Sequence, residues 1–167
     1  GSSGLIGHQV YEYLIKSSVY ELYNISHQNK TQDDTILINA RDESSFIANI
    51  IKIRPTIIVN CIGVLINESN INIENAIFLN SYLPHKIAKL ADRINAKFIH
   101  LSTDCVFSGI KKEPYIETDQ KDGIDNYAKT KGLGEVINDN HLTIRTSVVG
   151  PEIRQNGGEL FHWFMAQ

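Results

Sequence analysis

The sequence predicts an α/β fold built around a doubly wound parallel sheet. Apolar segments with a helical period alternate along the chain with short β-branched segments, which is the pattern of βαβ units. Segment 56–63 is a continuous β-branched run, as is typical of strands buried on both faces of a parallel sheet, and 97–107 is predicted as the next buried strand. The chain has 167 residues, which is enough for one compact domain.

Each element is predicted from its period and from the residues that bound it. Helices are expected at four segments: 5–15, 42–53, 74–95 and 126–138. Strands are expected between them: 19–26, 35–39, 56–63, 97–107 and 142–150. Pro55 closes the second helix, and Pro84 marks a start or a kink in the third. Residues 108–125 form a turn-rich loop, and the chain ends on the aromatic segment 159–167.

Composition excludes several classes of function. The formal charge is −3, and Lys111-Lys112 is the longest basic cluster, so nucleic acid is not an expected partner. No segment approaches the roughly 18 to 20 apolar residues of a membrane span. Cys61 and Cys105 each lie in a hydrophobic segment, which predicts buried, reduced thiols and a cytoplasmic location. No metal site is predicted.

The chain opens with GSSGLIG, which places Gly1, Gly4 and Gly7 at the spacing GxxGxxG. One interpretation is an expression tag, which would have no part in the fold. The other is a turn at a helix N-terminus, where backbone N–H groups and the helix dipole hold a pyrophosphate. The apolar helix that follows directly favours the second. It predicts a Rossmann-type dinucleotide-binding fold whose first strand is missing from this chain.

A proton-transfer pair is predicted from Tyr127 and Lys131 in YAKTK. Four residues apart on a helix, the two side chains share a face, so an ammonium can lower the pKa of the phenol. The same spacing occurs at Tyr82 and Lys86. That pair is interrupted by Pro84, and we interpret it as a packed aromatic residue beside a solvated lysine.

Polar residues end the segment 97–107 in HLSTDCVF. Ligands of open α/β sheets bind at the carboxyl ends of the strands, so Ser102, Thr103 and Asp104 are candidate substrate contacts. A hydroxyl there can hydrogen-bond a substrate carbonyl and the alkoxide that develops from it. The alternative is that Ser102 and Thr103 only cap the end of the strand or a turn.

Five motifs of the chain belong together: IIVNCIGVL, LNSYLPHKIAKLADRINAKFIHLSTDCVFSG, PYIETD, NYAKTKGLGE and IRTSVVGPE. In combination they resemble the extended short-chain dehydrogenase/reductases, and most closely the dTDP-4-dehydrorhamnose reductase family. The resemblance covers nearly the whole chain. It implies an NAD(P)H-dependent reductase of a 4-keto or related keto deoxysugar nucleotide, with a homodimer as one oligomeric state.

The resemblance also implies roles for individual residues. The catalytic set is Thr103, with Ser102 as its neighbour or substitute, together with Tyr127 and Lys131. Asp104 and Cys105 would lie near the substrate with Thr103. Besides Tyr127 and Lys131, the implied cofactor contacts are Gly1, Gly4, Leu5, Ile6, Gly7, Asn39, Cys61, Ile62, Gly63 and Asn80. Residues 1–150 would form the dinucleotide-binding domain, and 151–167 the start of a truncated substrate-binding part.

The chain departs from the family pattern at two positions. Cys105 replaces the usual Tyr after STD, and Cys61-Ile62-Gly63 replaces a run of small residues, which leaves the sugar open. Two other functions also fit this scaffold. One is a nucleotide-sugar epimerase or dehydratase, and the other is a non-catalytic subunit that resembles the regulatory subunit of methionine adenosyltransferase.

The cofactor preference is predicted from the segment SHQNK. An NAD site usually places a carboxylate about 20 residues after the glycines, to bind the ribose 2′-hydroxyl. Here Ser26, His27 and Lys30 occupy that window, and each can donate a hydrogen bond to a 2′-phosphate. The sequence therefore predicts NADP, with NAD as the alternative. The competing interpretation is a polar loop with no contact to the cofactor.

Overall fold

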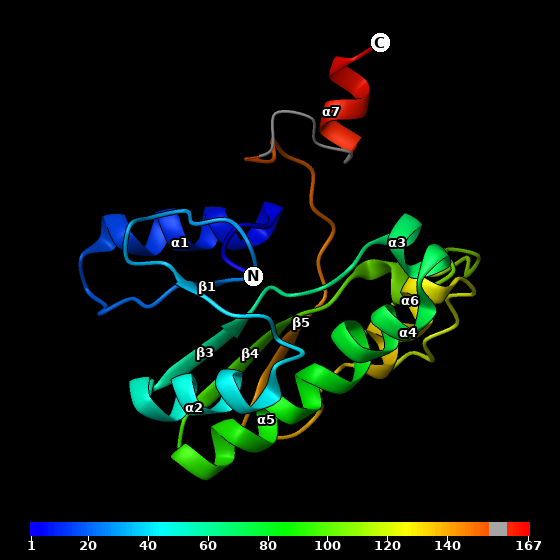
Figure 1. Ribbon diagram of the computed structural model, residues 1–167. Coiled ribbons are helices and arrows are strands. Elements are labelled where there is room, and N and C mark those ends of the chain that lie inside the picture. Colours follow the sequence, from blue (N-terminus) through cyan, green and yellow to red (C-terminus); the bar gives the residue numbers. More distant parts are fainter. Residues whose placement is uncertain (154–159) are drawn as a thin grey trace. The chain divides into compact units, whose positions relative to one another are not determined.

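The computed structural model describes residues 1–153 and 160–167 (Figure 1). The chain divides into two compact units, one formed by Gly1–Ile53 with Val148–Gln167 and the other by Arg54–Ser147. Each unit contains a small sheet, with the strand orders β1-β2 and β3-β4-β5. All of the pairings are parallel, as the alternation of helices and strands predicted.

The first unit begins with helix α1, Leu5–Ser17, which ends where Ser18 adopts the left-handed conformation at φ 53°. Strands β1, Ile25–Ser26, and β2, Ile36–Leu37, are shorter than predicted. Residues 19–24 form no strand. The side chains of Val19 and Tyr20 are 74% and 56% exposed, so no sheet face buries this apolar stretch.

Two helices complete the described part of the first unit. Helix α2, Glu43–Ile53, buries Phe46 and Ile50. The Asp42 carboxylate accepts hydrogen bonds from Ser45 N and Ser44 Oγ at the start of α2. Helix α7, Leu160–Met165, lies in the predicted aromatic segment, of which Glu159 is outside the described residues.

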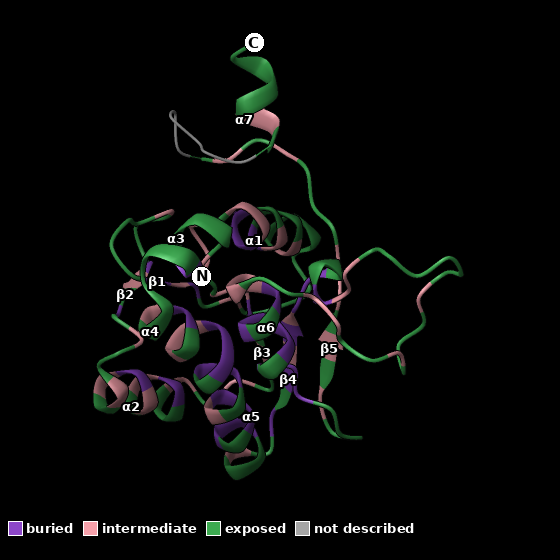
Figure 2. Cartoon of the chain, turned by 90° about the vertical axis from the view of Figure 1, so that its right-hand side faces the viewer, coloured by how far each residue is buried: buried purple, intermediate pink, exposed green. Residues whose placement is uncertain are grey.

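The core of the second unit lies between its sheet and helix α5, Leu83–Ile94. The sheet consists of β3, Ile57–Asn60, β4, Lys97–Leu101, and β5, Leu142–Ile144. Figure 1 shows α5 running along one face of these strands. Phe98 of β4 is fully buried, and the buried residues of α5 and β4 are purple in Figure 2.

The predicted helix 74–95 is divided into three parts. A short helix α4, Ile73–Ala76, leads into a π-helical segment η1, Ile77–Tyr82, and then into α5. Pro84 has no N–H to donate to the carbonyl four residues earlier, which explains why the chain makes wider turns here. Pro84 lies in the first turn of α5, so the predicted start at Pro84 is confirmed, and the π segment before it carries Asn80.

Three further boundaries correct the sequence prediction. Strand β4 ends at Leu101 rather than at residue 107, because a 3-10 helix η2, Asp104–Val106, follows it. Helix α6, Asn126–Leu133, ends before Gly134, and β5 ends at Ile144 rather than at residue 150. Helix α3, Ile66–Ile71, had no clear periodic signal.

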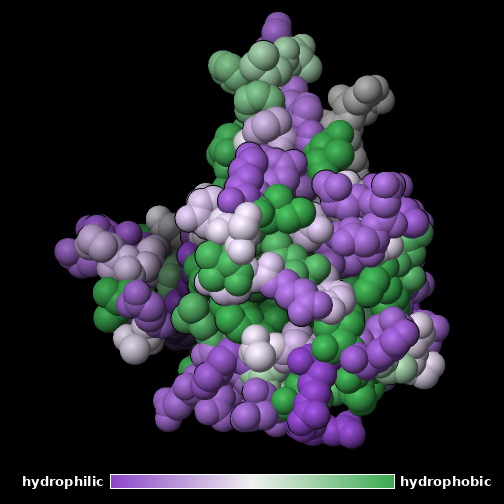
Figure 3. Space-filling model, turned by 90° about the vertical axis from the view of Figure 1, so that its left-hand side faces the viewer, coloured by the Kyte–Doolittle hydropathy of each residue, from purple (hydrophilic) through white to green (hydrophobic). Residues whose placement is uncertain are grey.

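The surface combines hydrophobic and hydrophilic residues (Figure 3). Cys61 is half-buried and Cys105 is exposed, so the predicted burial of Cys105 is wrong, and both thiols are free. Cys105 follows β4 in the 3-10 turn, where no sheet covers it. Within residues 1–153 and 160–167, no helix is both long and apolar enough to span a membrane.

His100 makes the second unit sensitive to acid. Its ring is fully buried, and Asn60 Nδ2 lies 3.1 Å from its Nδ1. Burial, reinforced by the positive charge of Lys131, lowers the pKa of His100 to about 3. The unfolded chain binds this proton near pH 6.5, so stability is present above that pH and is lost as the pH falls toward 3.

We expect His100→Leu to flatten the loss of stability between pH 6.5 and 4, although it destabilises the protein at pH 7 by leaving Asn60 without its partner. Between pH 6.5 and 3, His100 accounts for a loss of roughly 3 to 5 kcal/mol in the free energy of unfolding. Urea unfolding at several pH values measures it. The exposed His27, replaced by Leu, is the control. An unchanged pH slope in His100→Leu would contradict the assignment.

Candidate active site

The glycine turn is an integral part of the first unit. Ser2 N donates to Ile25 O at 3.2 Å, and Gly4 N donates to Gly1 O at 3.2 Å, so the turn is attached to β1. Gly4 is the N-cap of α1 and provides no side-chain cap. The N–H groups of the first helical turn therefore have neither an intrahelical acceptor nor a capping side chain. This arrangement suits an anionic ligand.

Gly7 and Gly4 meet different surroundings. A Cβ on Gly7 would lie 2.0 Å from Gly1 O, whereas the nearest atom to a Cβ on Gly4 is 3.5 Å away. The turn can approach the helix this closely only because position 7 has no side chain. Together with the N–H groups of α1, this close turn fits the pyrophosphate of a dinucleotide.

We expect Gly7→Ala to lower the free energy of unfolding by about 2 kcal/mol or more, because its methyl group must displace the backbone of the turn. Gly4→Ala makes no such clash and is the matched control. Chemical denaturation of the two variants checks the difference. Equal stabilities would show that the turn does not pack on α1 as described.

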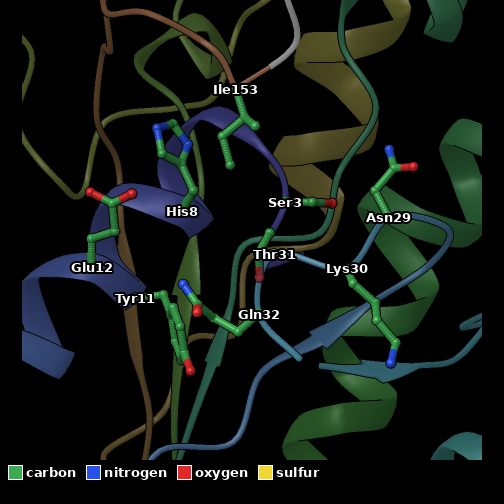
Figure 4. Close-up of a pocket in the computed structure, with 9 residues that line it drawn as sticks. All are labelled: Ser3, His8, Tyr11, Glu12, Asn29, Lys30, Thr31, Gln32 and Ile153. Atoms are coloured by element: carbon green, nitrogen blue, oxygen red, sulfur yellow. The ribbon is translucent and has the colours of Figure 1, made fainter. Parts of the chain in front are cut away.

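A pocket of about 420 Å³ lies beside the glycine turn (Figure 4). Its lining comes from the turn, from α1, from the segment after β1 and from Ile153: Ser3, His8, Tyr11, Glu12, Asn29, Lys30, Thr31, Gln32 and Ile153. Ser3, a residue that the sequence prediction missed, lies with its Oγ 2.8 Å from Ser26 Oγ. Its position between two glycines of GxxG is the signal that could have found it.

The three residues predicted to bind a 2′-phosphate have different environments. Ser26 is buried, at 1% exposure, and contacts Ser3. His27 is exposed. Lys30 lines the pocket, but its side chain runs away from Ser3, and its ammonium donates to Asp33 O at 3.2 Å (Figure 4). Their contact with a 2′-phosphate stays a prediction. So does the contact of Asn39 with the cofactor; its side chain accepts a hydrogen bond from Arg41 N.

In the second unit, Asn80 joins the loop after β3 to helix α6. Its Oδ1 accepts from Val64 N at 2.9 Å, and its Nδ2 donates to Val64 O at 3.0 Å and to Thr130 Oγ1 at 3.1 Å. A Cβ on Gly63 would lie 3.2 Å from Asn80 Oδ1 and 3.7 Å from Lys131 Nζ. Three residues predicted to contact the cofactor, Gly63, Asn80 and Lys131, are therefore neighbours.

Lys131 is the most unusual side chain of the candidate site. It is buried, at 5% exposure, and its Nζ donates to Leu101 O at 2.6 Å, at the carboxyl end of β4. Burial lowers its pKa to about 8, although Cys61 and Glu135 oppose the shift. Burial raises the pKa of the Cys61 thiol, and the Lys131 ammonium opposes that shift. Tyr127 lies one turn before Lys131 on α6, on the same face of the helix.

Ser102 and Thr103 make different hydrogen bonds. Ser102 Oγ donates to Glu135 Oε1 at 2.8 Å in the interior. Thr103 Oγ1 accepts from Cys105 N at 3.2 Å, as the cap of η2, and lies 3.3 Å from Asp104 Oδ1. Asp104 and Cys105 are exposed. The capping role that the sequence left as an alternative is thus real for Thr103.

Glu135 and Thr130 are further residues that the sequence prediction missed. Glu135 receives hydrogen bonds from Ser102 and Arg145, and Thr130 connects α6 to Asn80. Thr130 lies inside the YAKTK motif, so the motif could have identified it as a candidate residue. Glu135 follows a glycine at a helix end, and no local pattern distinguishes it from a solvated carboxylate.

The predicted residues divide between the two units. The first holds the glycine turn with Ser26, His27, Lys30 and Asn39. The second holds the catalytic candidates and the remaining predicted cofactor contacts: Cys61, Ile62, Gly63, Asn80, Ser102, Thr103, Asp104, Cys105, Tyr127 and Lys131. The second unit has hydroxyl groups after β4 and carries a phenol and a buried ammonium one turn apart on α6, and groups of these kinds can protonate an alkoxide.

Comparison with known proteins identifies relatives of this chain. A family model described as the RmlD substrate binding domain matches residues 1–164, which include the glycine turn. The dTDP-4-dehydrorhamnose reductase of Salmonella typhimurium is 39% identical over 103 residues, which cover 59% of this chain and 34% of that protein. The chain thus spans much less than two thirds of the length of this relative.

Two solved structures share the fold. A hypothetical dTDP-4-dehydrorhamnose reductase from Sulfolobus tokodaii has a TM-score of 0.79 and 28% identity, over 87% of this chain and 53% of that one. A dTDP-4-dehydrorhamnose reductase from Bacillus anthracis, in complex with NADP, has a TM-score of 0.74 and 24% identity, over 87% and 50%. The predicted Rossmann-type fold and the predicted resemblance are confirmed.

Proposed function

Because this chain belongs to the family defined by the RmlD substrate binding domain, we propose that it carries the active site of an NADPH-dependent reductase. Its substrate would be a 4-keto or related keto deoxysugar nucleotide, and dTDP-4-dehydrorhamnose is the first choice, because relatives are named as reductases of that compound. Residues 1–150 would bind the dinucleotide, and 151–167 would belong to the substrate-binding part. The reducing cytoplasm suits its two free cysteines.

The buried Lys131 carries this proposal. Its ammonium is held at the carboxyl end of β4, where ligands of α/β sheets bind, and it shares a helix face with Tyr127. Removing a lysine from water is unfavourable, and a fold tolerates it most readily where the charge has a task. A positive charge near the phenol stabilises the phenolate that remains after Tyr127 gives up its proton.

Other residues would bind the substrate and the cofactor and transfer the proton. Bound NADPH would supply the hydride. Thr103 would hold the keto oxygen through its hydroxyl, and Tyr127 would transfer its phenolic proton to the alkoxide that develops on that oxygen. Gly63 and Asn80 would place the backbone of the loop after β3 beside Lys131, and the glycine turn would hold the pyrophosphate.

The test is a reductase assay of the whole protein with dTDP-4-dehydrorhamnose. We expect oxidation of NADPH in step with formation of the reduced sugar, and weaker binding of NADH. The preference for NADPH should decrease at higher salt, because Ser26, His27 and Lys30 would contact a charged phosphate. Conversion of a nucleotide sugar without net NADPH consumption would instead identify an epimerase or dehydratase. Binding of dinucleotide without any turnover would favour a regulatory subunit.

A further inference from the structure

Glu135 has a buried carboxylate that contacts side chains from three other segments of the second unit. Its side chain is 1% exposed. Arg145, just after β5, donates from Nε to Oε1 and from Nη2 to Oε2, each at 2.8 Å. Lys121, from the loop 107–125, lies with its Nζ 3.2 Å from Oε2. Ser102, just after β4, donates to Oε1 at 2.8 Å.

This carboxylate stays charged despite its burial. Burial by itself would raise the pKa of Glu135, but hydrogen bonds from Arg145, Ser102 and Lys121 outweigh it and hold the pKa below its usual range. A buried ion pair gives little net stability compared with a packed apolar side chain. Stability alone therefore gives no reason to place a carboxylate beside the catalytic candidates.

The first effect of Glu135 is on Ser102. A serine hydroxyl has one proton, and Ser102 directs it to a buried carboxylate, which is a strong acceptor. A substrate carbonyl needs a hydrogen-bond donor, so Ser102 cannot serve it while this contact holds. Thr103 Oγ1 accepts from Cys105 N and donates to Asp104 over 3.3 Å, and a ligand can replace this longer donated contact at a small cost.

The second effect of Glu135 is on Lys131, which lies four residues earlier. The titratable groups facing Lys131 come from three elements: Cys61 after β3, His100 on β4, and Tyr127 and Glu135 on and just after α6. Among these groups, Glu135 is the carboxylate. Its negative charge opposes the effect of burial and favours the charged form of Lys131.

We propose that Glu135 is a positioning residue of the active site: it engages the hydroxyl of Ser102, which leaves Thr103 to bind the carbonyl, and it supplies the negative charge behind Lys131. The proposal rests on the reductase function proposed above. Glu135 does not touch the reacting atoms, so it acts entirely through Ser102, Lys131 and the two cations that hold it.

The test compares Glu135→Gln with Glu113→Gln, which removes an exposed carboxylate from the loop 107–125. In the whole protein, Glu135→Gln should lower kcat about 10- to 100-fold, with the Kd for NADPH changed less than about threefold. The fall of activity at high pH should begin about half a pH unit lower or more. Side-chain NMR of Lys131 should show the same shift, and Glu113→Gln should show none of these changes.

A purely structural role would lower the melting temperature of Glu135→Gln without moving either titration. Unchanged kcat and an unchanged Lys131 titration in a folded Glu135→Gln overturn the proposal. If that variant does not fold, Glu135→Asp replaces it, because it keeps the charge and shortens the reach to Ser102; an unchanged kcat there also overturns the proposal. If the wild-type protein reduces no nucleotide sugar, the proposed function fails, and the NMR titration of Lys131 still tests Glu135.

Discussion

Tyr127→Phe is expected to lower kcat by about 10²- to 10⁴-fold, because it removes the proton that the developing alkoxide must receive. The ring and its packing stay, so the Kd for NADPH should change little and the protein should stay folded. Single-turnover kinetics with NADPH and the keto sugar measure the effect on the chemical step, apart from binding and product release.

Tyr82→Phe provides a control with the same local geometry. Lys86 Nζ lies 3.4 Å from Tyr82 OH, so this pair has both the spacing and the contact of a proton-transfer pair. Tyr82 is 47% exposed and packs on Phe78, with ring centroids 5.6 Å apart. We expect its kcat to stay within about twofold of wild type. The reverse outcome, loss of activity in Tyr82→Phe alone, would move the active site to η1 and α5.

Lys131→Met is expected to lower kcat by at least about 10²-fold, because an apolar side chain cannot stabilise the phenolate of Tyr127. The wild-type enzyme should lose activity as the pH rises through about 8, where the buried ammonium gives up its proton. Met fills a similar volume, so folding should be retained. A pH–rate profile of both proteins checks this, and wild-type activity that stays constant up to pH 10 would contradict it.

The sequence predicted which residues share a helix better than it predicted the ends of the strands. Tyr127 and Lys131 both lie on α6, as expected, because a helix places residues four apart on one face, and this depends only on local geometry. Their catalytic roles stay a prediction. The ends of β4 and β5 were predicted too far along the chain. Apolar residues such as Val106 continue past the strand, and the period alone does not show that Thr103 caps a 3-10 turn.

Longer-range features gave weaker signals. The strand predicted at 19–26 is mostly unpaired, because pairing depends on a partner segment that the local pattern does not specify. Glu135 could not be recognised because its partners Ser102, Lys121 and Arg145 meet it only in the folded chain. The π-helical turns at Asn80 depend in the same way on packing as well as on Pro84.

The contact between η1 and α6 limits how this protein can change over evolutionary time. A Cβ at Gly134 would lie 1.8 Å from the backbone oxygen of Asn80, and that atom belongs to the main chain, so no choice of rotamer can move it aside. Gly109, in contrast, has open space around it, and its φ of 77° is a backbone conformation that Asn also adopts. A substitution at position 109 therefore costs backbone strain, least for Asn, whereas one at 134 also requires η1 and the end of α6 to separate. Because of this contact, we expect the distance between Asn80 and helix α6, which carries Tyr127 and Lys131, to stay constant as the sequence changes.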